Sequence, residues 1–177
     1  TYFFYHDDGL PGGHGYCRSV CVEEMFFNPD GTIQQLHMTE GIKEGLGTLN
    51  PYKRVEAETI AVSVGVHSSG TKETGICITD IHPGDYIKLR AVDFGDGAKR
   101  FTARAASRYF GGNIELHLDA IDGPTVGTLR TAYTGEWDRY KEFSCDVNGA
   151  EGIHDLFLVF NGRPMTLMNL DWWRFDR

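Results

Sequence analysis

Apolar and polar residues alternate in short stretches along most of the chain, for example over residues 86–90, 101–105 and 114–118. Successive side chains of a β-strand point to opposite faces, so each stretch predicts a strand with one core face and one solvated face. No segment has the three-to-four-residue spacing of apolar positions that indicates an amphipathic helix. The pattern therefore predicts an all-β protein.

Twelve segments have the alternation or the β-branched and aromatic content that is typical of strands. They cover residues 2–6, 16–27, 32–37, 55–59, 75–80, 86–92, 100–107, 113–119, 126–131, 140–147, 153–160 and 167–175. Turn-forming clusters separate them, such as Asn-Pro-Asp-Gly at 28–31 and His-Pro-Gly-Asp at 82–85. Short strands at this spacing predict a sandwich or a barrel.

Residues 39–52 differ from their surroundings because they carry three glycines and a proline and show no sustained periodicity. Such a composition is typical of a connector. We therefore divide the chain into an N-terminal β segment, residues 1–50, and a complete β domain, residues 51–177. Three strands alone are marginally stable, so the N-terminal segment needs a partner to pack against.

Composition and charge exclude several function classes. Apolar residues make up 41% of the 177 residues, and 22 glycines fit a β-rich protein with many turns. A net charge of −8 without any basic run argues against a nucleic-acid partner. No apolar stretch approaches the roughly 18 residues that a membrane span needs. A divalent cation or a neutral polar ligand suits this chain better.

The four cysteines do not form a recognisable framework. Cys17, Cys21, Cys77 and Cys145 are too few and too scattered for a disulfide scaffold, and one Cys-x3-Cys spacing is a poor zinc pattern. We expect buried reduced thiols. A bridge between Cys77 and Cys145 is the alternative.

Two glutamates stand two positions apart in the strand predicted at residues 55–59. Glu56 and Glu58 would share one face of that strand, where two carboxylates repel unless a positive charge lies between them. Asp171 lies in an apolar and aromatic segment, and a buried ionised carboxylate needs a partner. Together the three carboxylates would form a hard-oxygen site that suits calcium.

Ordered motifs over residues 54–177 resemble carbohydrate-binding module family 6. The motifs lie at 55–58 (Val-Glu-Ala-Glu), 81–87 (Ile-His-Pro-Gly-Asp-Tyr-Ile), 92–98 (Val-Asp-Phe-Gly-Asp-Gly-Ala), 111–119, 134–137 (Thr-Gly-Glu-Trp), 152–160 and 169–173 (Asn-Leu-Asp-Trp-Trp). The resemblance implies a jelly-roll β-sandwich with a structural calcium ion. It also implies a monomer that binds sugar without catalysis.

Residues 1–50 resemble the last strands and the exit linker of a glycoside hydrolase family 43 propeller. The similarity lies at residues 2–6 (Tyr-Phe-Phe-Tyr-His), 18–23 and 28–33. It implies a covalently linked arabinofuranosidase or xylosidase domain whose catalytic carboxylates lie upstream. The chain starts without Met or a signal-peptide pattern, so we expect it to begin inside a longer protein. The resemblance implies that this protein is secreted, periplasmic or on the cell surface.

The family 6 resemblance also assigns calcium ligands. It gives the side chains of Glu56, Glu58 and Asp171, together with backbone carbonyls from Asp171 and from the turn around Lys72 to Thr74. Six or seven oxygens would then tie the first strand of the domain to its last.

The same resemblance maps a sugar cleft onto Trp137 and Asn169, with the Trp as the stacking ring. At the position where many members carry a facing Tyr, this chain has Asp80. Tyr109, Phe110 or Tyr133, all in predicted loops, could supply the second ring instead. A one-sided clamp that includes Asp80 would imply weak or altered recognition.

Three functions remain in competition. The first is a non-catalytic module that binds xylan, arabinoxylan or xylo-oligosaccharide and targets an attached hydrolase. The second is a fragment that retains arabinofuranosidase or xylosidase activity, for which the acidic residues of 6–8 and 23–24 are candidates. So small a segment offers little to build a cleft around them. The third is a structural sandwich without a working sugar site.

Overall fold

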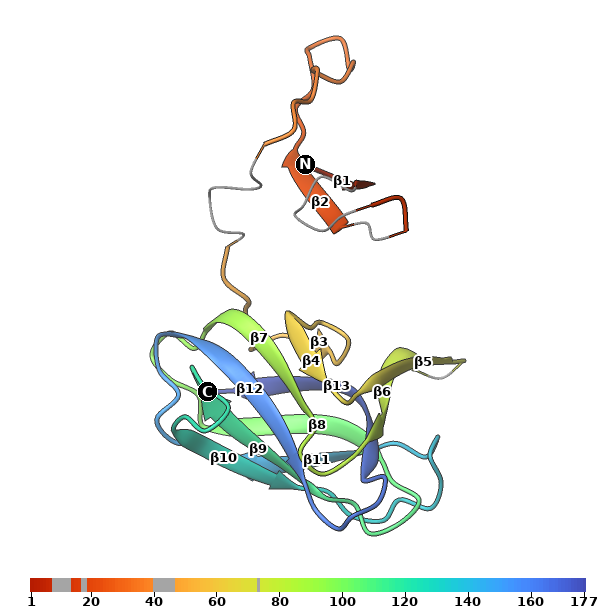
Figure 1. Ribbon diagram of the computed structural model, residues 1–177. Coiled ribbons are helices and arrows are strands. Elements are labelled where there is room, and N and C mark those ends of the chain that lie inside the picture. The colour runs from red at the N-terminus through yellow and green to blue at the C-terminus, as the bar shows by residue number, and fades with distance from the viewer. Residues whose placement is uncertain (8–13, 17–18, 40–46, 73) are drawn as a thin grey trace. The chain divides into compact units, whose positions relative to one another are not determined.

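The computed structural model of the chain describes residues 1–7, 14–16, 19–39, 47–72 and 74–177. It divides into two compact units, Thr1–Leu46 and Gly47–Arg177. Every regular element in the described residues is a strand, which confirms the all-β prediction (Figure 1). No helix among these residues is long and apolar enough to span a membrane.

The first unit contains one two-stranded sheet. Strand β1 (Tyr2–Asp7) pairs antiparallel with β2 (Ser19–Glu24). The strand predicted at residues 32–37 is wrong, because only Ile33 pairs, through one isolated bridge to Phe27. Both side chains are more than half exposed, at 55% and 52%, so no buried face supports a longer ladder.

The second unit is a sandwich of two antiparallel sheets (Figure 1). One sheet has the order β10-β9-β12-β7-β4, and the other has the order β11-β8-β13-β6-β5 with β3 added to β13. The strands are β3 (Val55–Glu56), β4 (Val62–Val64), β5 (His67–Thr71), β6 (Gly75–Ile81), β7 (Tyr86–Asp93), β8 (Arg100–Ala106), β9 (Asn113–Leu118), β10 (Thr125–Arg130), β11 (Lys141–Asp146), β12 (Ile153–Asn161) and β13 (Met168–Asp176).

Strands β4 and β5 were not predicted. Both are short, both lie at the outer end of a sheet, and β5 has the sequence His-Ser-Ser-Gly-Thr, which has no apolar alternation. An edge strand of this kind is held by its backbone ladder, which a pattern of side chains does not reveal.

The core lies between the two sheets and is filled by the inward residues of both. Trp173, Phe101 and Phe175 are fully buried, and the Phe101 and Phe175 ring centroids are 4.9 Å apart. Phe94 meets Phe175 edge to face at 5.1 Å. Offset and edge-to-face aromatic packing adds to the free energy gained by burying these rings.

The three cysteines that the structure describes are free thiols. Cys77 and Cys145 are both free, so the alternative of a bridge between them is wrong. Cys77 is buried, which agrees with the expected reduced thiol, whereas Cys145 and Cys21 are half-buried. Cys17 lies outside the described residues.

A charged network stabilises an irregularity in the sheet where the register of β12 shifts between His154 and Leu156. The Asp155 carboxylate accepts hydrogen bonds from Lys88 Nζ at 2.7 Å and from the amide of Ala91 at 3.1 Å. The Lys88 bond is the main reason that the pKa of Asp155 is lowered, against the opposing effect of burial. Ala91 has a left-handed φ of 51°, a conformation that the hydrogen bond from its amide to the Asp155 carboxylate helps to hold.

We expect Asp155→Asn to lower the free energy of unfolding by about 1 kcal/mol at pH 7. Because the folded-state pKa lies below the roughly 3.9 of an unfolded Asp, the ionised carboxylate stabilises the fold above that pH. This contribution is lost as pH falls through the folded-state pKa. Urea unfolding should therefore show a smaller difference in the free energy of unfolding between wild type and variant at pH 3 than at pH 7.

The exposed Glu142 on β11 supplies the control, since Glu142→Gln removes one negative charge outside this network. If the free energy of unfolding of Asp155→Asn differed from that of the wild type by the same amount at pH 7 and pH 3, the electrostatic account would be wrong.

Candidate functional site

Three loops meet at one end of the sandwich. They follow β8 and precede β11 and β13, and both of these strands pair antiparallel with β8. They span residues 107–112, 131–140 and 162–167. Ser107 is buried, and its Oγ donates to the carbonyl of Leu167 at 2.7 Å while it accepts from the amide of Gly111 at 3.1 Å. One hydroxyl thus joins two of the loops.

Thr134 joins the third loop to the same point. The amide of Ser107 donates to Thr134 Oγ1 at 2.8 Å, and the amide of Thr134 donates to the carbonyl of Ser107 at 2.9 Å. Both residues are buried, so these bonds do not compete with bulk water. We call Ser107 and Thr134 the hydroxyl junction.

An aromatic pair lies on the loops that the junction holds. Tyr109 is 47% exposed, Trp137 is half-buried, and their ring centroids are 5.6 Å apart at an interplanar angle of 85°. Asn169 Nδ2 donates to the carbonyl of Trp137 at 2.9 Å. The structure therefore brings together three predicted residues, with an edge-to-face pair in place of two facing rings.

Asp80 lies one strand away from this pair. Ile81 opposes Met168 and Ile78 opposes Leu170, so the shift in register leaves Asp80 beside Asn169 across the ladder. Its φ is 56°, and its carboxylate is partly exposed. His67 Nε2 and His82 Nε2 lie 3.9 Å and 3.8 Å from its two oxygens. Asp80 thus offers acceptors, not a stacking surface, to the candidate site.

Tyr133 is 63% exposed and precedes Thr134 of the hydroxyl junction. Within the described residues its ring makes no ring contact with Trp137 or Tyr109. Of the three replacement rings considered from the sequence, Tyr109 is therefore the one that the structure places against Trp137.

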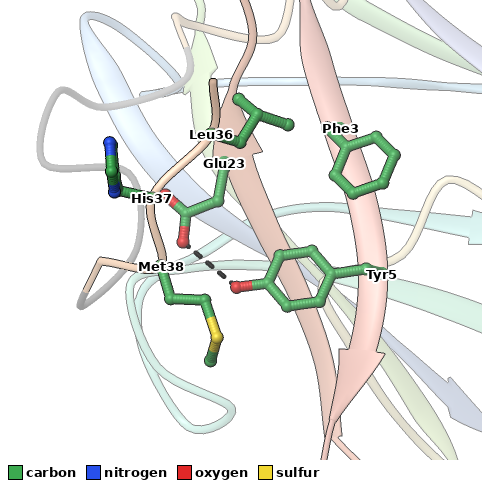
Figure 2. A pocket seen from close by; sticks show the side chains of 6 residues that line it. All are labelled: Phe3, Tyr5, Glu23, Leu36, His37 and Met38. Carbon is green, nitrogen blue, oxygen red and sulfur yellow. Dashed lines mark hydrogen bonds between the residues drawn. The ribbon is translucent and has the colours of Figure 1, made fainter.

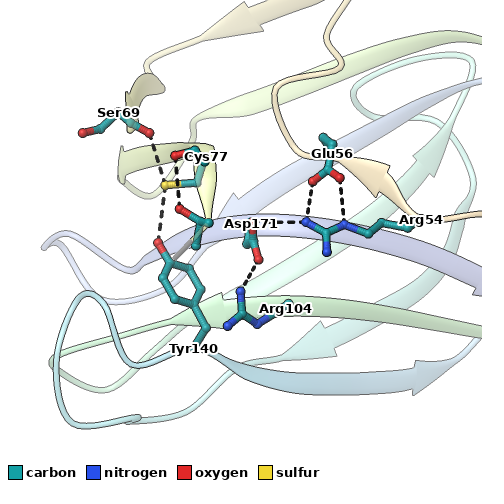
Figure 3. Close-up of polar contacts among 9 residues, drawn as sticks. Arg54, Glu56, Ser69, Cys77, Arg104, Tyr140 and Asp171 are labelled. Carbon is teal, nitrogen blue, oxygen red and sulfur yellow. Dashed lines mark hydrogen bonds and ion pairs between the residues drawn. The ribbon is translucent and has the colours of Figure 1, made fainter. Parts of the chain in front are cut away.

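Tyr140 and Cys77 lie next to Asn169 and extend the candidate site. The sequence did not identify either of them as a site residue. The Tyr140 hydroxyl lies 3.4 Å from Cys77 Sγ, and the ring lies under the guanidinium of Arg104 at 4.9 Å (Figure 3). Burial, followed by the hydrogen bond with Cys77, raises the pKa of Tyr140, while the Asn169 side chain acts in the opposite direction. The phenol therefore stays neutral.

The predicted cation site centres on Asp171, which is fully buried where β13 bulges against β8. Asp171 Oδ2 is bonded by Arg104, and Arg54 Nη2 lies 3.8 Å from Oδ1 (Figure 3). Asp171 Oδ1 and Glu58 Oε2 are buried, and neither has a hydrogen-bond partner among the described residues. Two buried carboxylate oxygens without hydrogen-bond partners have the ligand chemistry that a hard cation prefers.

The rest of the predicted ligand set differs from expectation. β3 ends at Glu56, and Glu58 lies in the turn that follows, so the prediction that both share one strand face is wrong. Arg54 holds Glu56 instead, with two contacts of 2.8 Å. Lys72 is exposed, and residue 73 lies outside the described part.

In that described part no three His, Cys, Asp or Glu residues are grouped for a metal. Glu58 and Asp171 therefore fit a cation, whereas Glu56 could join them only if Arg54 released it.

The first unit has a small apolar cavity of about 140 Å³, lined by Phe3, Tyr5, Glu23, Leu36, His37 and Met38 (Figure 2). The buried Glu23 accepts from Tyr5 Oη at 3.2 Å and from both the amide and the hydroxyl of Thr39, at 2.8 and 2.7 Å. The Thr39 bonds are the main cause of its lowered pKa. Glu23 is thus an ionised, saturated acceptor, and Asp8 lies outside the described residues.

The loop end therefore has the chemistry of sugar recognition. The faces of sugar rings are apolar and pack against aromatic side chains, while amides, hydroxyls and carboxylates bind the sugar hydroxyls. Trp137 and Tyr109 supply the rings, Asn169 bonds the Trp137 backbone, and Asp80 lies on the strand next to Asn169.

Comparison with known proteins agrees with this chemistry. The family model for carbohydrate binding module (family 6) matches residues 56–177. An arabinoxylan arabinofuranohydrolase of Paenibacillus polymyxa is 42% identical over 94% of this chain, and the chain spans 27% of that relative.

Solved structures extend the comparison. A family 6 carbohydrate-binding module from Clostridium cellulolyticum in complex with xylose has 40% identity and a TM-score of 0.71, over 73% of this chain and 100% of that one. A glycoside hydrolase family 43 arabinoxylan arabinofuranohydrolase from Bacillus subtilis in complex with cellotetraose has 35% identity and a TM-score of 0.78, over 99% of this chain and 38% of that one.

The Bacillus subtilis alignment includes the first unit, which confirms the resemblance of the N-terminal segment to family 43 proteins. The family model covers most of the second unit, whose sandwich agrees with the solved module. The chain belongs to carbohydrate-binding module family 6.

Proposed function

We propose that the second unit binds xylan, arabinoxylan or xylo-oligosaccharide at the loop end around Trp137, and holds a covalently linked hydrolase on that polysaccharide. The xylose complex of one relative and the arabinoxylan-directed enzymes among the others support the choice of sugar. Tethering raises the local concentration of substrate without a new catalytic contact. Because the proposed ligand is a cell-wall polysaccharide, we expect the protein to act outside the cytoplasm, as a secreted, periplasmic or cell-surface protein.

One observation carries the proposal. An accessible aromatic pair, Trp137 and Tyr109, is fixed by the buried hydroxyl junction and by the bond from Asn169. Loops that are already ordered lose little conformational entropy when they bind, so even a shallow site can hold a sugar chain.

Retained hydrolase activity has less support. Glycoside hydrolysis needs two carboxylates at a defined separation, one of them able to donate a proton. Glu23 is held ionised by three hydrogen bonds and serves to fasten Thr39, so it is poorly suited to act as that acid.

Calcium has a structural role in this proposal. Glu58 and Asp171 would hold the ion at the junction of β3 and β13, where the amide of Ala57 already donates to the carbonyl of Asp171 at 2.9 Å. The ion supplies positive charge to oxygens that lack partners. Arg104 and Arg54 already offset part of the Asp171 charge, so the fold should persist without calcium, at lower stability.

We expect Trp137→Ala to weaken binding to insoluble xylan at least tenfold, because a central aromatic contact commonly contributes 2 kcal/mol or more. Affinity electrophoresis and depletion assays would measure the change. Phe26→Ala is the matched control, since Phe26 is 53% exposed in the first unit. Unchanged xylan binding by Trp137→Ala would favour the structural-sandwich function.

We expect EDTA to lower the melting temperature while leaving xylan binding at room temperature nearly intact. Calcium at 100 times its Kd would restore about 2.7 kcal/mol of stability. Glu58→Gln should lose most of this calcium-dependent increment, and Glu56→Gln less of it, because Arg54 holds Glu56.

Two results would contradict the structural role of calcium. One is a melting temperature that does not respond to calcium. The other is loss of xylan binding in EDTA with unchanged melting, which would place the ion in the sugar site.

A further inference from the structure

Two glycines bring a second pair of side chains together beside the aromatic pair. A Cβ on Gly162 would lie 2.6 Å from Leu167 Cδ2 and 3.4 Å from the Cα of Gly112. A Cβ on Gly112 would lie 2.8 Å from the carbonyl oxygen of Asn161. Neither position has room for a side chain, so the loops 107–112 and 162–167 pack backbone against backbone.

Phe110 and Arg163 meet across this contact. The Arg163 guanidinium carbon lies 4.0 Å from the Phe110 ring centroid, and Phe110 is 59% exposed. Stacking on the ring restricts the guanidinium while its N–H groups remain available around its edge. The pair is therefore an ordered surface feature with one apolar and one cationic component.

The Arg163 guanidinium forms no ion pair within the part of the chain that the structure describes. Arg108 and Arg104, from the same sheet and its loops, do pair with carboxylates: Arg108 lies 3.5 Å from Glu136, and Arg104 bonds Asp171. No described carboxylate pairs with Arg163, although the chain carries a net charge of −8. An uncompensated cation at the binding end indicates an anionic group on the ligand.

We propose that Phe110 and Arg163 form a subsite for a uronic acid substituent of the polysaccharide whose backbone packs at Trp137. This inference rests on the proposed function. The guanidinium would bind the sugar carboxylate with two parallel hydrogen bonds, and the Phe110 ring would contact C–H groups of the same sugar. Phe110 directly follows Tyr109, so one branched chain can reach both places.

The test compares one polymer in two forms, glucuronoxylan and the same glucuronoxylan with its carboxyl groups reduced to alcohols. We expect the wild-type chain to bind the carboxylated form about tenfold more tightly at low salt. This preference should shrink as ionic strength rises. Arg163→Gln should abolish the preference without changing the affinity for the reduced polymer.

Arg177→Gln is the matched control, because Arg177 also stacks on an aromatic ring, with its guanidinium carbon 4.7 Å from the Tyr52 centroid. Tyr52 bonds the carbonyls of Phe94 and Gly97, next to the opposite end of β8. This variant should keep the full preference. Phe110→Ala should reduce it, and thermal melts would show whether each variant remains folded.

The outcomes separate the two proposals. Equal binding of both polymers by the wild type, or a preference that survives Arg163→Gln, would overturn the uronic acid subsite alone. Binding of neither polymer would overturn the proposed function and the subsite with it.

Discussion

The antiparallel ladder between β13 and β8 is the interaction on which the rest of the second unit depends. On its inner face β13 contributes Trp173 and Phe175 to the core. At its start it places Asn169 against the loop of Trp137, and at its bulge it buries Asp171. The core, the candidate cation site and the candidate sugar site thus all depend on one strand, and a shift of its register by one residue would move its residues in all three to the opposite face.

The alternation of apolar residues predicted a sandwich or a barrel and most of its strands. Where that signal is weak the prediction failed: β4 and β5 are edge strands, and the bridge at Ile33 has no buried face. The pairing of strands could not be read from the pattern, because it depends on contacts between residues far apart in the chain. Only the family resemblance supplied the jelly-roll topology.

The candidate site was predicted in part. Trp137, Tyr109 and Asn169 do meet, but the arrangement of Glu56 and Glu58 was wrong because β3 ends after two residues. The hydroxyl junction was missed, since an isolated Ser or Thr has no sequence signal that marks it as buried and shared between loops. Arginines that stack or pair across the fold were missed for the same reason, because only the fold brings them to their partners.

The central claim is that sugar binds at the loop end, and NMR titration of the isotope-labelled chain with xylohexaose tests it most directly. Binding there predicts that the largest shifts occur at the Trp137 indole N–H and at the amides of Tyr109 and Asn169, while those of β10 and β9 stay unchanged. Shifts concentrated on the outer face of the β10-β9-β12-β7-β4 sheet, with Trp137 unaffected, would contradict the account.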